Sequence, residues 1–294
     1  MKLIRPSAVT DAILLSSNVP ENDFGVWESI YPYAVGQSVI KGHRIWESVQ
    51  AANLNHDPET SGITWWIDAG PVNRWAMFDG EVGTATVADE NITITLQPGR
   101  IDSVALLGVD ASVVTVTMRL GATVIYQKVT SMIDDSGITD WFDWFFNPIE
   151  AKDYAVMTDI PVFGEATLEI IISKPVGQVS CGMCIIGLKS ELGGTMRGTS
   201  LGINDYSKKT VNDFGNATLV QRSFSKRMGV KLILPNGDVD RVHAVLSAHR
   251  AMPVVWIGSD RYSSTLIYGF YRDFEVDVAY AYDSYCTINI EGMI

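Results

Sequence analysis

The sequence has few cysteines, few histidines and no long apolar run, and each scarcity removes a class of function. Three cysteines, Cys181, Cys184 and Cys286, cannot complete a tetrahedral zinc site without a His pair, and no His pair stands near CGMC in the sequence. The apolar run at residues 12–20 is too short and too polar to span a bilayer. It also lacks the small-residue cleavage pattern of a secretory signal, so we expect synthesis in a cytoplasm without export.

Basic residues are scarce as well. Lys and Arg number 22 against 34 Asp and Glu, which gives a formal net charge of −12. This charge repels phosphate backbones, and no basic stripe offsets it, so we expect no nucleic-acid partner. Hydrophobic residues make up 47% and charged residues 19%, a globular composition, and 294 residues allow two or three domains.

The pattern that is present is that of short β-strands. From about residue 68 to 189, β-branched apolar residues alternate with Thr, Arg and Gln at period two, and turn residues interrupt them about every ten positions. This pattern predicts a β-sandwich. Cys181 and Cys184 have redox spacing in CGMC, but they lie in a β-branched run without helical period, so we interpret them as buried or semi-buried strand cysteines.

The remaining segments complete a mostly β protein. Val239, Val242, Val245 and Leu246 recur at helical spacing and predict one short helix over residues 238–250. The glycine-rich stretch 191–207 favours an ordered loop between sheets over a linker. We predict four parts, namely an N-terminal arm (1–23), an aromatic-rich module (24–67), a β-sandwich (68–189) and a C-terminal β-rich domain with one helix (190–294).

No enzyme is apparent. The chain has no H-E-x-x-H and no phosphate-binding glycine loop, and its histidines are scattered. A glycosidase pair could lie among the acidic residues near residue 140, because sequence does not reveal carboxylate separation. The alternatives for these acids are a solvated loop or a cation site. The acids are Asp134, Asp135, Asp140 and Asp143.

The same acids surround the most aromatic short segment, DWFDWFF, at residues 140–146. Neither a helical nor a strand pattern would bury all of its rings, and Trp, Tyr and Phe are enriched in interface hot spots. We therefore expect a loop that either contacts a partner or caps the open end of the sandwich. The candidate interface residues are Trp141, Phe142, Trp144, Phe145 and Phe146.

The module between Val26 and Trp66 holds four of the eight tryptophans. Its order is Trp27, then Tyr33-x-x-Gly-x-x-Val39, a Gly turn, Trp46 and a closing Trp65-Trp66 pair. This order resembles the small chitin- and cellulose-binding modules of bacterial glycosidases. The resemblance covers about forty residues and implies a three-stranded sheet whose aromatics serve partly as core and partly as a sugar platform.

So small a module cannot bury a core without some of its rings. We assign Trp27 and Trp65 to the core. The rings expected to contact glycan or a protein partner are Tyr33, Trp46 and Trp66.

The order of further blocks along the chain carries a second resemblance. An N-terminal LIRPSAVTDAILLSSNVPEND, then GPVNRWAMFDGEVGTAT, DWFDWFFNP and YGFYRDFEV are similar to a family of virion structural proteins of tailed bacteriophages. The resemblance spans nearly the full length and implies a tail, tail-tip or baseplate protein assembled as a ring or trimer with other tail proteins. It supplies no catalytic residue and no cofactor.

We therefore expect a structural protein of the virion tail that acts through subunit contacts and has no enzymatic activity, cofactor or metal. The alternatives are a host-surface glycan-binding adhesin and a glycan hydrolase.

Overall fold

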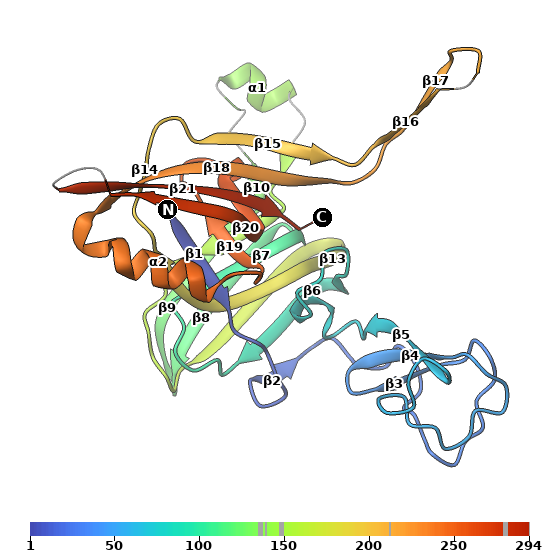
Figure 1. Ribbon diagram of the computed structural model, residues 1–294. Helices are drawn as coiled ribbons and strands as arrows, with labels where there is room; N and C mark the ends of the chain where they lie inside the picture. The colour runs from blue at the N-terminus through green and yellow to red at the C-terminus, as the bar shows by residue number, and fades with distance from the viewer. Residues whose placement is uncertain (135–137, 139, 147–149, 212, 279–281, 294) are drawn as a thin grey trace. The chain divides into compact units, whose positions relative to one another are not determined.

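A computed structural model gives the structure of the chain for residues 1–134, 138, 140–146, 150–211, 213–278 and 282–293, apart from the side chains of Asp143 and Glu150. Strands account for 53% and helices for 9% (Figure 1). The predicted mostly β fold class is therefore confirmed. Within the described residues, no helix is long and apolar enough to cross a membrane.

The chain divides into two compact units. The C-terminal unit comprises Met1–Ser7 with Ile186–Ile294, and the N-terminal unit comprises Ala8–Ile185. The first seven residues thus belong with the end of the chain, and the rest of the predicted N-terminal arm belongs with the N-terminal unit. The long strand β13 (Thr167–Glu191) runs from one unit into the other.

The N-terminal unit contains a sandwich-like body and a separate three-stranded sheet. Its further elements are β2 (Leu14–Ser17), β3 (Ser38–Lys41), β4 (Arg44–Ser48), β5 (Trp66–Pro71), η1 (Ala76–Phe78), β6 (Thr86–Leu96), β7 (Ser103–Asp110), β8 (Val113–Leu120), β9 (Thr123–Ser131), β10 (Ile133–Asp134), α1 (Trp141–Phe146), β11 (Glu150–Ala151) and β12 (Tyr154–Met157).

Two long strands, β6 and β13, organise this body. β6 pairs along β13 in two stretches separated by an irregularity between Ser173 and Gln178. Beside the first stretch, β8 pairs with the other edge of β13, and β9 pairs with β8. Strand β7 also pairs with β13, and β12 pairs with β7. Period-two alternation buries one face of β6 and of the first stretch of β13. Among the buried residues of β6, β8 and the first stretch of β13 are Ile92, Ile94, Leu96, Val114, Val116, Met118, Leu168, Ile170 and Ile172.

The C-terminal unit is an antiparallel sheet covered by one helix. Its strands follow the order β13, β1, β19, β20, β21, β18, with β14 and β15 both paired to β18. Its elements besides β13 are β1 (Lys2–Pro6), β14 (Gly194–Thr195), β15 (Ser200–Asp205), β16 (Lys208–Val211), β17 (Ala217–Val220), β18 (Phe224–Pro235), η2 (Asn236–Asp238), α2 (Val239–Ala248), β19 (Val254–Ile257), η3 (Ser263–Thr265), β20 (Leu266–Asp277) and β21 (Asp283–Gly292).

Helix α2 confirms the helix predicted over residues 238–250. Val242 and Leu246, one turn apart, enter the core formed by the sheet, and Val245 packs at its margin. The Tyr271 hydroxyl donates to the Leu246 carbonyl at 2.9 Å, which satisfies an acceptor in the last turn. The glycine-rich stretch predicted as a loop contains the strands β14 and β15.

Candidate functional sites

The aromatic segment near residue 140 forms the short helix α1, so the prediction of a loop was wrong. Its backbone closes a turn through the Trp144 amide, which donates to the Asp140 carbonyl at 3.2 Å. Because successive helical residues are about 100° apart, the five candidate rings spread over roughly 200° of the helix circumference, which is more than half of it. This spread is wider than one narrow apolar stripe, which explains why no single-face pattern is visible in the sequence.

All five rings of α1 are exposed. The exposed fractions run from 62% for Trp144 to 79% for Trp141. Phe142 and Phe146, one turn apart, contact each other with centroids 4.6 Å apart. Clusters of exposed apolar side chains are typical of surfaces that bind other proteins. Of the two alternatives that the sequence left open, the exposure favours a partner contact over a cap on the sandwich.

The three-stranded sheet β3–β4–β5 forms the predicted aromatic module. Its two-residue turn, Gly42-His43, has positive φ at both positions, +58° and +63°, as a type I′ hairpin requires. Tyr33, Val39 and Trp66 form its buried centre. The Tyr33 and Trp66 rings meet edge to face, with centroids 5.3 Å apart.

Two of the three expected contact rings are therefore core residues. Tyr33 is 4% and Trp66 1% exposed, which corrects the expectation that both present a face to a ligand. Hydrogen bonds satisfy their polar atoms: Trp66 Nε1 donates to the His56 carbonyl at 2.8 Å, and the Tyr33 hydroxyl accepts from the Glu28 amide at 2.6 Å. Both rings therefore stabilise the fold of the module and present no face to a ligand.

The other tryptophans surround this centre. Trp27 and Trp65 pack against it half-buried, as expected for core residues, and Trp46 does the same. Lys41 Nζ lies 4.2 Å from the centroid of Trp27, and the His56 ring stacks on Trp65 at 3.5 Å. Of the three predicted contact rings, Trp46 alone keeps part of its surface open, so a sugar platform in this module would depend on it.

A charged cluster ties this module to the residues that precede it. Asp11 and Glu21 approach the two ring nitrogens of His43, at 3.1 Å from Nε2 and 2.8 Å from Nδ1. The Arg74 guanidinium lies 3.6 Å from Glu21, and the Trp75 ring stacks on His43 with centroids 4.4 Å apart. Burial lowers the pKa of His43, but hydrogen bonds and charges from Glu21 and Asp11 raise it more, so the net pKa lies above its usual value.

This arrangement predicts a stability that depends on pH. A histidine whose folded-state pKa is raised stabilises the fold fully below its unfolded pKa of about 6.5 and loses that contribution as pH rises through the folded pKa. The free energy of unfolding, measured with denaturant, should therefore fall more between about pH 6 and about pH 8 in the wild type than in His43→Asn. Asparagine is the matched replacement because it tolerates the positive φ but does not titrate. Equal losses in both proteins would exclude the ion cluster as the cause.

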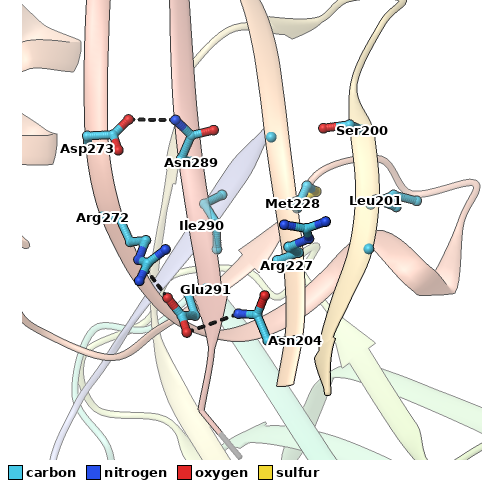
Figure 2. A pocket seen from close by; sticks show the side chains of 12 residues that line it. Ser200, Leu201, Asn204, Arg227, Met228, Arg272, Asp273, Asn289, Ile290 and Glu291 are labelled. Atoms are coloured by element: carbon cyan, nitrogen blue, oxygen red, sulfur yellow. Dashed lines mark hydrogen bonds and ion pairs between the residues drawn. The ribbon is translucent and has the colours of Figure 1, made fainter. Parts of the chain in front are cut away.

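A polar depression that the sequence analysis missed lies on the outer face of the C-terminal sheet. It has a volume of about 390 Å³ and is lined by β15, β18, β20 and β21 (Figure 2). Glu291 accepts from Arg272 Nε at 2.8 Å and from Asn204 Nδ2 at 3.0 Å. Its charged residues are two arginines and two acids, so it has no excess charge to attract an ion. Because its residues come from four distant segments, no local sequence pattern could have revealed it.

The structure confirms the interpretation of the cysteines as buried strand residues. All three are free and buried on β13 and β21. Burial raises the pKa of Cys181 to about 12 and that of Cys286 to about 11, and it raises the pKa of Cys184 well above its usual value. These thiols are protonated at neutral pH and so lack the thiolate that thiol–disulfide chemistry needs.

The acidic candidates for a glycosidase remain untested. Asp134 ends β10 and Asp140 precedes α1, whereas Asp135 and the side chain of Asp143 lie outside the described part of the chain. Among the described residues, no group of three or more His, Cys, Asp or Glu side chains is placed to hold a metal ion.

Comparison of the chain with models of known protein families found no match, and comparison with curated proteins found none either.

Proposed function

We propose that the protein is a structural subunit that acts through protein–protein contacts, as a component of the tail, tail tip or baseplate of a tailed-bacteriophage virion. The observation that carries the proposal is α1, which exposes five aromatic side chains in six consecutive residues. Clustered aromatic side chains supply much of the binding energy of protein interfaces. The resemblance of the sequence blocks to tailed-phage virion proteins supports the location in the tail.

Two further observations support a binding role over chemistry. The three cysteines are buried as protonated thiols, and the polar depression pairs its acids with arginine and amide donors. The aromatic module uses Tyr33 and Trp66 to fold, which leaves less ring surface for a glycan than a sugar platform would need. These observations favour the structural subunit over the adhesin and the hydrolase.

The test is the incorporation of variants into particles. Replacing both Trp141 and Trp144 by alanine should weaken binding to the partner at least about thirtyfold, since one hot-spot aromatic contributes about 2 kcal/mol. Thermal unfolding should stay within about 0.5 kcal/mol of the wild type, because both side chains are exposed. Quantitative mass spectrometry of purified virions, together with calorimetry of the free subunit, measures both effects.

A matched control is Tyr262→Ala, which removes a ring with 64% exposure from the C-terminal unit. It should leave both incorporation and unfolding unchanged. Absence of the wild-type chain from purified virions would contradict the proposed role in the virion. A marked loss of stability in the double variant would show that the α1 rings are core residues and would contradict the interface.

A further inference from the structure

The hairpin β16–β17 is a second exposed element. Lys208–Val211 pairs with Ala217–Val220 as a two-stranded sheet of its own, between β15 and β18 in the chain. In Figure 1 it runs outward beyond those two strands as a narrow arm. Every residue of both strands is exposed. An isolated two-stranded hairpin is marginally stable in water, so a sequence that forms one needs a surface to pack on.

The arm has one apolar face. Residues that pair directly share a face, and residues two apart along a strand share it too. Lys209 pairs with Leu219 and Val211 with Ala217, so these four side chains form one face. The opposite face combines Lys208 and Val220 with Thr210 and Thr218. The first face presents Val211 at 59% and Leu219 at 72% exposure, so in the single chain it is uncovered.

The arm is also basic on an acidic chain. Residues 206–223 contain Lys208, Lys209 and Arg222 against the single acid Asp213, a charge of +2. Because the whole chain has a formal charge of −12, the rest of the chain carries −14. The balance between basic and acidic residues is reversed around α1. Residues 129–151 contain five acidic residues and no Lys or Arg. The chain therefore exposes two apolar elements of opposite charge, and opposite charges favour encounter and correct register between partners.

We propose that the apolar face of the β16–β17 arm packs on the α1 helix of a second copy of this chain. This inference rests on the proposed function, since it names the partner of the same aromatic surface. Aliphatic Val211 and Leu219 would contact the α1 rings, while Lys209, on the same face, would lie near the acids that flank the helix. Such a contact joins different surfaces of two copies, so it is heterologous and builds a closed ring or an open filament according to its rotation.

The test is cross-linking between two different single-cysteine variants. Leu219→Cys and Phe145→Cys subunits, mixed and treated with a short bismaleimide, should give a mixed dimer, because the native thiols are buried. Thr218→Cys, one residue away on the opposite face of the arm, is the matched control and should cross-link several-fold less. Equal yields for Leu219→Cys and Thr218→Cys, or no dimer from either, would overturn the proposal.

A second variant pair checks association in solution. Leu219→Asp should weaken self-association more than about tenfold in sedimentation analysis, because it places a charge on the apolar face, whereas Thr218→Asp should have a small effect. Self-association equal to that of the wild type in both variants would also overturn the proposal. Detection of the wild-type chain in virions despite these negative results would leave the structural role standing, and its partner at α1 would then be another protein.

Discussion

Replacing Trp66 by alanine is expected to unfold the β3–β4–β5 module. The ring is 1% exposed, it meets Tyr33 edge to face, and its Nε1 donates to the His56 carbonyl. Truncation of a buried Trp costs about 3–5 kcal/mol through lost burial and the cavity left behind. Because Tyr33, Val39 and Trp66 are the three residues of the buried cluster, the remaining core is too small to compensate for that loss.

Limited proteolysis followed by mass spectrometry would measure this effect, since it locates new cleavage sites. Cleavage in Trp66→Ala should become rapid within residues 24–71 and should stay slow in the β6 and β13 strands. Trp46→Ala is the matched control, because that ring is half-buried and packs at the margin of the same cluster. It should accelerate cleavage less. Resistance of Trp66→Ala equal to that of the wild type would show that Trp66 is not the centre of the module.

The sequence could predict the β elements because their signal is local. On β13, Leu168, Ile170 and Ile172 alternate with Thr167, Glu169 and Ile171, and alternation at period two produces one buried face in any strand. The helix α2 was equally visible, since Val242 and Leu246 lie one turn apart between an Asn-Gly-Asp start and an arginine end. Such patterns need no knowledge of distant partners.

The assignment of the paired tryptophans failed for a structural reason. Trp65 ends a turn, in which its amide donates to the Gly62 carbonyl at 3.2 Å, and Trp66 is the first residue of β5. Both rings contact the same cluster, but Trp66 is part of its buried centre and Trp65 packs against it half-buried. Which of the two is buried more deeply depends on the residue at which the turn passes into the strand, and no property of two identical residues reveals it.

Helix α1 illustrates a different limit. Aromatic residues favour strands, and six residues are too few to show a helical period. The sequence therefore indicated a loop, although its inference that not all the rings could be buried agrees with the exposure of all five. The composition of the segment was enough to infer that some rings are exposed, whereas its helical backbone could be recognised only in the structure.

Long-range pairing also escaped prediction. Strand β1 lies between β13 and β19, where Lys2 pairs with both Glu191 and Ile257. Leu3 and Ile4 are fully buried there. The short apolar sequence at residues 3–4 gives no sign that its partners on β13 and β19 lie nearly two hundred and about two hundred and fifty residues away, so the sequence alone predicts an arm. The polar depression has the same origin in distant strands.

This β1 pairing leads to the second large expected effect, that of Gly187→Ala. Gly187 of β13 pairs with Pro6 of β1, and a Cβ on Gly187 would lie 1.9 Å from the Arg5 carbonyl oxygen and 3.0 Å from its carbonyl carbon. These are backbone atoms held by the ladder, so they cannot turn aside as a flexible side chain would. The strand must move, which disturbs the buried Leu3 and Ile4. Overpacking of this kind costs about 2–3 kcal/mol.

Chemical denaturation with circular dichroism would measure the loss, with Gly237→Ala as the matched control in the same unit. A Cβ on Gly237 meets no atom within 4 Å, so this substitution should stay within about 0.5 kcal/mol of the wild type. Gly187→Ala should in addition accelerate amide exchange at Ser7, whose amide donates to the Ile186 carbonyl at 2.8 Å beside the affected pair. If both variants unfold at the wild-type midpoint, residues 1–7 are not a strand of the C-terminal sheet, and their assignment to that unit is wrong.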